Sequence, residues 1–390
     1  MSATPDPAPR TSLRELALLF LRLGATAFGG PAAHIAIMED EVVRRRRWLT
    51  EERFLDLLGA TNLIPGPNST EMAIHIGWVR RRWAGLVVAG AAFIVPAMLM
   101  TGALGWAYVR YGSIPTAVWF FYGVKPVILA VVVQAIWGLA PKAARTTQLR
   151  LLAVVTATLA ALGVNELVLL FGAGLAAVAA ARIPRPPEPG SSVVRQLVPI
   201  VPLAAGAVAP SAVTVSGLFL IFLKIGSVLF GSGYVLLAFL RADLVERLGW
   251  LTESQLIDAV AVGQVTPGPV FTTATFIGYV LAGPSGALAA TAGIFLPAFV
   301  FVALSGPLVP RLRASKAAGA FLDGVNVASL ALMTVVTFQL GHAALVDAPT
   351  VALAVGAALV LLRFRPNASW LVLGGAAAGW ALHALRVASG

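Results

Sequence analysis

Cysteine is absent from the 390-residue chain, which excludes disulfides, thiolate metal sites and cysteine nucleophiles. The four histidines are scattered, without a His-x-x-x-His or Glu-x-x-His spacing, so we expect no structural metal. The chain has no Walker sequence, which argues against ATP hydrolysis. These absences together predict a protein without a cofactor.

Charged residues are scarce as well. They make up only 12% of the chain, whereas a soluble domain carries roughly 25%. Apolar residues make up 58%, and the mean hydropathy is +0.87. The net charge of +11 does not indicate a nucleic-acid partner, because the basic residues form short clusters between long apolar runs. The composition therefore predicts a polytopic membrane protein.

Several apolar runs are long enough to cross a bilayer as helices, which takes roughly 20 residues. They show no period-2 alternation, so helices are favoured over barrel strands. The long runs lie at 84–109, 114–140, 286–308, 317–340, 345–363 and 368–386. Shorter runs broken by Gly or Pro lie at 13–28, 31–43, 51–63, 68–79, 212–230, 233–245, 253–265 and 270–282. The segments 149–163 and 165–182 predict one short helical hairpin.

The sequence repeats itself. A shift of 202 residues aligns FLRLGATAFGG (20–30) with FLKIGSVLFGS (222–232), and also aligns the two WLTE and the two PGP segments. The second repeat then lacks one residue relative to positions 70–77 of the first, and a shift of 201 continues the match. Two homologous halves in a membrane chain are typical of transporters. We predict a tail at 1–12 without signal-peptide features, repeats at 13–182 and 212–390, and a linker with a connecting helix at 183–211.

Charge placement predicts that the two repeats have opposite orientations. If each broken pair is a re-entrant hairpin and 194–208 crosses once, the second repeat is inverted. Most basic residues then fall on the cytoplasmic face, as the positive-inside rule requires. In addition, RRRR precedes the first WLTE where ERLG precedes the second. The predicted fold is an all-α polytopic membrane protein with two inverted-topology repeats, broken helices and re-entrant hairpins.

The two PGP segments carry the strongest local signal. Their prolines end one half-helix and allow another to begin. In an inverted pair, two half-helix N-termini meet near the membrane midplane, and their free N–H groups suit an anion. The alternative is a kink in an ordinary helix. The candidate ligands are Pro65, Gly66, Pro67, Asn68, Ser69, Pro267, Gly268 and Pro269, with Asn68, Ser69 and Thr70 as candidate N-caps.

A second break, at Phe28, Gly29 and Gly30, is matched by Gly231 and Ser232. Small residues there allow a substrate to meet main-chain N–H groups, although close helix packing is the alternative.

Cations within the apolar runs are candidate anion ligands, because a charge at that depth needs a partner or a role. Arg22 and Lys224 superpose in the repeat, whereas Lys125 is matched by Asn326. For the matched pair, snorkelling toward the headgroups is the alternative.

Proton coupling requires a group whose charge changes, and His34, Glu39, Glu71 and His75 are the candidates, all in the first repeat. For Glu39 and Glu41, pairing with nearby arginines at helical spacing is the favoured alternative. Asp56 and Asp258 match across the repeat and are interpreted as caps or structural partners. WLTE is interpreted as an interfacial Trp followed by a Thr N-cap.

The motifs FGGP…MEDEVV…WLTEERFLDLL…IPGPN, with the looser copy FGSG…WLTE…TPGP, resemble the chromate ion transporter family in its long, two-domain form. The resemblance covers roughly 13–386. It implies a non-enzymatic protein of the bacterial inner membrane that exports chromate, a sulfate-like oxyanion. The matching residues are Phe28, Gly29, Gly30, Pro31, Glu39, Trp48, Pro65, Gly66, Pro67 and Asn68, and the second copy departs from the pattern at Ser232, Gly233 and Val270.

The expected partners are a chromate- or sulfate-like oxyanion and the lipid bilayer, with a homodimer as the protein assembly considered. Two other functions stay open from the sequence. One is a membrane-embedded lipid diphosphate phosphatase, because Pro65–Ser69 distantly resembles a phosphatase loop. The other is a passive anion channel, which differs only in coupling.

Overall fold

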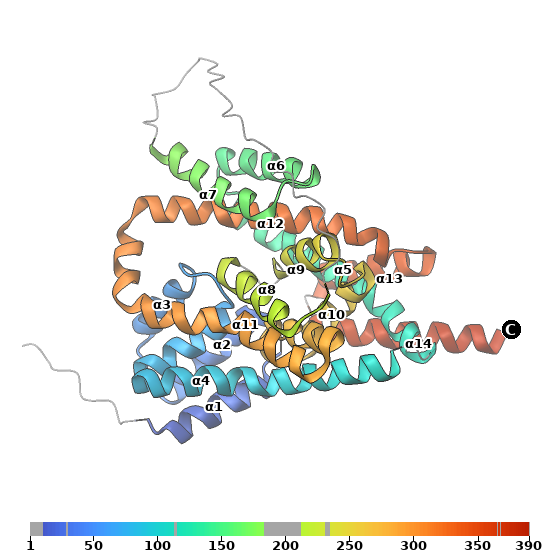
Figure 1. Ribbon diagram of the computed structural model, residues 1–390, viewed down its shortest axis with the longest axis horizontal. Helices are drawn as coiled ribbons and strands as arrows, with labels where there is room; N and C mark the ends of the chain where they lie inside the picture. The colour runs from blue at the N-terminus through green and yellow to red at the C-terminus, as the bar shows by residue number, and fades with distance from the viewer. Residues whose placement is uncertain are drawn as a thin grey trace, which may run out of the picture.

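The computed structural model describes residues 11–28, 30–112, 115–182, 212–230, 235–364, 366 and 368–389, and every regular element in these ranges is helical (Figure 1). The first repeat contains α1 (Leu13–Thr26), α2 (Gly30–Glu39), the π-helix η1 (Asp40–Arg45), α3 (Glu51–Thr61), α4 (Asn68–Tyr111), α5 (Pro115–Ala143), α6 (Thr147–Ala161) and α7 (Glu166–Arg182). The second contains α8 (Val215–Val228), α9 (Leu236–Leu240), the π-helix η2 (Arg241–Arg247), α10 (Glu253–Val265), the 3₁₀ turn η3 (Val270–Thr272), α11 (Thr273–Ala314), α12 (Lys316–Ala344), α13 (Ala348–Phe364) and α14 (Ala368–Ser389).

The repeat found in the sequence is also a repeat of structure. Helix α4 folds back at Arg81 and Arg82, and α11 folds back at Ala282 and Gly283, with nearly the same backbone angles. The arms of each folded helix touch through glycines, since a Cβ on Gly77 would lie 2.2 Å from the Gly85 oxygen. The predicted boundaries between 68–79 and 84–109, and between 270–282 and 286–308, are confirmed as these folds.

The two repeats run in opposite directions. In Figure 1, α4 beyond its fold runs from left to right and leads into α5, whereas α11 beyond its fold runs from right to left and leads into α12. The packing pairs match as well: α1 packs on α4 as α8 packs on α11, and α7 packs on α12 as α14 packs on α5. The predicted inverted-repeat architecture is confirmed.

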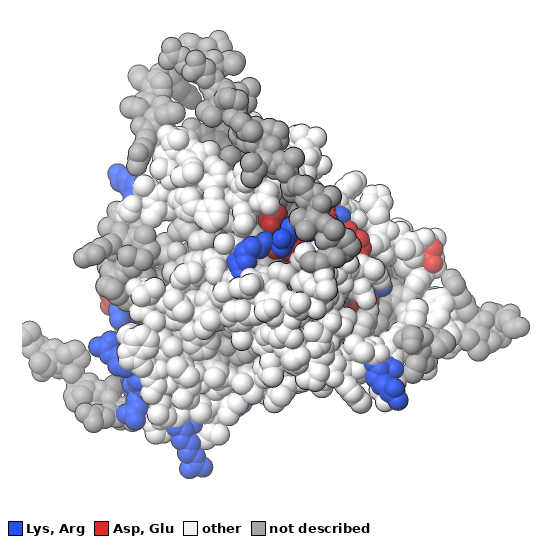
Figure 2. Space-filling view, in the orientation of Figure 1, with Lys and Arg blue, Asp and Glu red and all other residues white. Residues whose placement is uncertain are grey.

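Five of the described helices are long and apolar enough to cross a membrane, and shorter apolar helices accompany them. The visible face is almost entirely uncharged, and basic side chains gather at its left and lower-left edges (Figure 2). The predicted hairpin is confirmed as α6 and α7. Gly29, Gly231, Ser232, the connecting helix at 194–208 and the start of the tail lie outside the described residues.

The two repeats carry different residues at two equivalent positions where the backbone is left-handed. Among the described residues, Arg47 and Arg82 are the non-glycine residues with positive φ, both at 51°. Their counterparts are Gly249, at 62°, and Gly283, at 60°. A side chain at such a position costs of order 1–3 kcal/mol. The first repeat therefore carries positive charge at two places where the fold favours glycine, which is consistent with a cytoplasmic location for this end.

Candidate anion-transport site

The two PGP turns hold the repeats together by reciprocal hydrogen bonds. The Gly66 N–H donates to the Leu229 carbonyl at 2.8 Å, and the Gly268 N–H donates to the Ala27 carbonyl at 2.9 Å. Ala27 and Leu229 are the C-caps of α1 and α8. Each turn therefore caps a helix of the other repeat, and we call this pair of reciprocal contacts the crossing.

Each PGP segment separates two helices instead of kinking one. Helix α3 ends at Thr61 and α4 begins at Asn68, with Gly66 at φ 140° in the turn between them. In the second copy, Gly268 has φ 86°. After the second PGP turn the chain begins with the 3₁₀ turn η3, whereas after the first it begins directly as the α-helix α4. The tighter turn fits the one residue that the second repeat lacks here.

The N-terminus of α4 differs from the prediction in its cap. The N-cap is Pro67, without a side-chain cap, and the Asn68 side-chain amide instead donates to Asn62 at 2.8 Å. A proline side chain has no oxygen to accept a hydrogen bond from a backbone N–H. With Pro67 instead of Asn68 at the N-cap position, the helix therefore has no side-chain cap. Bonding within the helix begins with the Glu71 N–H and the Pro67 carbonyl. The N–H groups at 68–70 therefore point out of the helix end.

Buried polar side chains surround this helix end. Ser69, Thr70 and Glu71 are all buried, and Glu71 is 0% exposed. Neither carboxyl oxygen of Glu71 has a hydrogen-bond partner among the described residues, and the same holds for Thr70 Oγ1. A Cβ on Gly66 would lie 2.3 Å from Glu71 Oε1, so this carboxyl lies directly against the PGP turn.

The predicted histidines have different places. His34 Nε2 lies 3.0 Å from the Ala27 carbonyl, which also accepts the Gly268 N–H, so His34 belongs to the crossing. His75 is buried one turn beyond Glu71. Phe28, by contrast, is 42% exposed.

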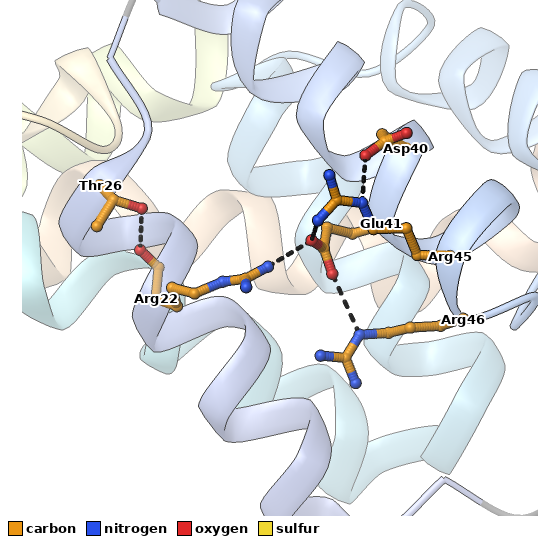
Figure 3. A network of polar contacts seen from close by, with 6 residues as sticks. All are labelled: Arg22, Thr26, Asp40, Glu41, Arg45 and Arg46. Carbon is orange, nitrogen blue, oxygen red and sulfur yellow. Dashed lines mark hydrogen bonds and ion pairs between the residues drawn. The ribbon is translucent and has the colours of Figure 1, made fainter.

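The matched cations have matched carboxylates, and Figure 3 shows the network of the first repeat. Arg22 lies 2.5 Å from Glu41, which also contacts Arg45 and Arg46. Lys224 lies 2.5 Å from Asp243, which also contacts Arg247. As positioned here, Arg22 and Lys224 join α1 to η1 and α8 to η2. Binding an anion would require them to leave these carboxylates.

The neighbouring pair is reversed in charge between the copies. Glu39 pairs with Arg44 in the first repeat, and Arg241 pairs with Glu246 at the equivalent positions of the second. The predicted pairing of Glu39 with Arg44 and of Glu41 with Arg45 is confirmed. The Thr N-caps of both WLTE segments are also confirmed, by Thr50 and Thr252.

Replacing Asp243 by asparagine is expected to lower the free energy of unfolding by about 3–5 kcal/mol, because two cations lose a carboxylate whose side chain is only 2% exposed. Thermal unfolding in detergent measures this. The surface-pair variant Glu39→Gln is the control and should cost about 0–1 kcal/mol. The swap Lys224→Asp with Asp243→Lys should recover much of the loss. If the swapped protein stays as unstable as Asp243→Asn, the Lys224–Asp243 ion pair is not the source of the stability.

Lys125 joins the two repeats. It contacts Ser254 Oγ and lies 3.4 Å from Asp258, whose other oxygen accepts a hydrogen bond from the Tyr108 hydroxyl at 2.9 Å. The structural role inferred for Asp258 holds, but its partner comes from the other repeat. Asp56 pairs instead with Arg53, at 3.9 Å.

A polar cavity of about 450 Å³ was not foreseen from the sequence. It lies between the α6–α7 turn, η2 and α12, and charged side chains show as a mixed patch in the middle of Figure 2, where Figure 1 draws α8 and α9. Its lining includes Asn165, Glu166, Arg241, Asp243, Arg247 and Gln339. The 202-residue shift aligns Glu41 with Asp243 and Arg22 with Lys224, but it gives no sign that these segments line a cavity.

Two inverted repeats of broken helices, crossing through buried proline–glycine turns, define an all-α membrane protein of the transporter class. The chain belongs to the chromate transporter family, whose model matches residues 14–178 and 216–380.

Curated relatives agree with this assignment. A chromate transport protein of Cupriavidus metallidurans is 34% identical over 95% of this chain and 93% of its own length. A chromate transport protein of Pseudomonas aeruginosa is 33% identical over 97% and 94%, and a probable chromate transport protein of Synechococcus elongatus is 31% identical over 88% of each chain. No solved structure matches the chain.

Proposed function

We propose that the protein is a secondary transporter that exports chromate or a similar tetrahedral dianion from the bacterial cytoplasm across the inner membrane. The reciprocal crossing is the observation that carries this proposal. It joins each PGP turn to the end of a half-helix in the oppositely oriented repeat. A site held between two oppositely oriented repeats can open to either side of the membrane.

The anion binds at the N-terminus of α4. The outward-pointing N–H groups at 68–70 and the hydroxyls of Ser69 and Thr70 supply donors in a buried setting. The N–H groups of Gly66 and Gly268 are engaged in the crossing and are not available. The turns therefore shape the site, and the residues that follow them bind the anion.

Glu71 is the best-placed coupling residue. An ionised carboxylate without a partner is costly in an apolar setting, and it would repel a dianion at the same helix end. Dianion binding therefore requires Glu71 to be protonated. Glu71 takes up a proton with the dianion on one side, releases it with the dianion on the other and returns ionised. One proton then accompanies each dianion, and the net charge moved is −1. An inside-negative membrane potential drives such a complex outward.

Flux in proteoliposomes tests this proposal. Radiolabelled chromate and sulfate should leave vesicles faster when the inside is negative, and lowering the pH on the substrate side should speed sulfate flux. Sulfate is the sharper probe, because its own charge is constant near neutral pH. Flux that dissipates any imposed gradient without saturation would indicate a passive anion channel instead. No flux of either anion would overturn the proposal.

A further inference from the structure

The two inverted repeats differ strongly at one pair of equivalent helices, α3 and α10. Leu55 of α3 is 54% exposed, whereas its counterpart Ile257 of α10 is 3% exposed. The side chain of Asp56 is 48% exposed and that of Asp258 is 5% exposed. Arg53 and Asp56 lie on the exposed side of α3, so this side faces water. Similar sequences therefore occupy different surroundings.

The difference arises from what covers each helix. Helix α10 packs against α5 and α14, and Ser369 of α14 donates to the Gln264 carbonyl at 2.9 Å. The counterparts of α5 and α14 are α12 and α7. Over the described ranges, α3 packs on α4 and α11 and makes no comparable packing with α12 or α7.

The main packing pairs of the two repeats remain alike. The pairs α5–α14 and α7–α12 pack closely, as do α1–α4 and α8–α11. The glycine contacts repeat too, since a Cβ on Gly24 would lie 2.4 Å from the Phe93 oxygen and one on Gly226 would lie 2.3 Å from the Ile294 oxygen. The asymmetry thus lies at α3 and α10 and at the short helices before them, since α2 packs on α4 whereas α9 packs on α12 of its own repeat.

We propose that α3 and α10 are two gates and that the structure shows one open and the other closed. The closed gate is α10, held to α5 by the Lys125–Asp258 ion pair with Tyr108 and Ser254. The open gate is α3. Because Arg44–Arg47 directly precede WLTE and α3, the positive-inside rule places this open gate on the cytoplasmic side. The inference rests on the proposed transport function, in which the two gates exchange states once per cycle.

The gates are built with unequal strength. When α3 closes against α12 as α10 closes against α5, Asp56 takes the place of Asp258, and Asn326 takes the place of Lys125. A neutral amide replaces an ammonium, so the cytoplasmic gate closes on a hydrogen bond and the opposite gate on an ion pair. Both bonds have a carboxylate acceptor, but only the ammonium adds a direct charge–charge attraction to it. This inequality favours the cytoplasm-open state when substrate is absent.

Single thiols can report on both gates, because the native chain contains no cysteine. Leu55→Cys and Ile257→Cys would each be reacted with a maleimide in detergent-solubilised protein, with Leu218→Cys, which replaces a fully buried residue, as the unreactive control. We expect position 55 to react at least tenfold faster than position 257. Similar rates at 55 and 257 would overturn the proposal.

Two variants that interchange the gate residues complete the test. Lys125→Asn weakens the contact that holds α10 closed, and Asn326→Lys strengthens the contact that α3 makes when it closes. Each should raise the reaction rate at 257 and lower the rate at 55, by about tenfold when combined. A rise at 257 with no fall at 55 would show that the gates are not coupled, and no change in either variant would show that this ion pair is not a gate. Because labelling needs no substrate, coupled gates in a chain without chromate or sulfate flux would leave this inference standing and overturn only the proposed substrate.

Discussion

Gly268→Ala is expected to abolish stable accumulation of the protein in membranes. The added Cβ would lie 2.7 Å from both the Ala97 Cβ and the Gly24 oxygen, so it meets packed atoms of the first repeat. The backbone there has φ +86°, which an alanine rarely adopts. Strain of order 1–3 kcal/mol adds to overpacking of about 1–3 kcal/mol. The sum is a large share of the stability of an ordinary domain.

Membrane yield and thermal unfolding in detergent measure this effect. Gly138→Ala is the matched control: it lies within α5 with nothing within 4 Å of an added Cβ, so alanine should be neutral or slightly stabilising there. Gly66→Ala should resemble Gly268→Ala, because its Cβ would meet the Glu71 carboxyl. A Gly268→Ala protein that unfolds within a degree or two of the native chain would contradict the described crossing.

Glu71→Gln is expected to uncouple sulfate transport from proton transport without unfolding the protein. Glutamine has nearly the same shape and cannot ionise, so it stands in for the protonated carboxyl. Sulfate flux should lose its dependence on pH. The charge moved per sulfate should rise from one to two, which a flux measurement at several imposed potentials detects.

Glu39→Gln is the control for this result, because Glu39 is another coupling candidate but is paired with Arg44. It should keep the native pH dependence. Three ionisable groups on elements packed near this end of α4 are engaged elsewhere: Arg22 with Glu41, Arg53 with Asp56, and His34 with Ala27. His75, one turn along α4, has no hydrogen-bond partner for Nε2 among the described residues. Unchanged pH dependence in Glu71→Gln would remove Glu71 from the coupling step, and His75 would then be the group to test.

Local features could be predicted from the sequence because they depend on residues close together in the chain. The proline–glycine turns, the Thr caps of WLTE and the inverted repeat all follow from local patterns or from the 202-residue shift. The pairing of Arg44 with Glu39 was predictable for the same reason.

Contacts between distant segments could not be derived in this way. Arg22 and Lys224 were predicted to be anion ligands, and their partners Glu41 and Asp243 were not identified because these carboxylates lie on separate elements. The π-helical turns η1 and η2 set the direction of those carboxylates, and a π-turn has no clear sequence signal. The different surroundings of Asp56 and Asp258 were also hidden, because both aspartates follow a WLTE segment at the same spacing and the packing on the other repeat is not visible in the sequence.

The crossing has a consequence for the timing of synthesis. Leu229, which accepts the Gly66 N–H, is added about 160 residues after Gly66. At 5–20 residues per second the first turn waits roughly 10–30 s for its acceptor. During that interval a buried amide inside the nascent first repeat lacks its final partner, and so does the Ala27 carbonyl. The first repeat therefore cannot reach its native structure until the ribosome has read well into the second.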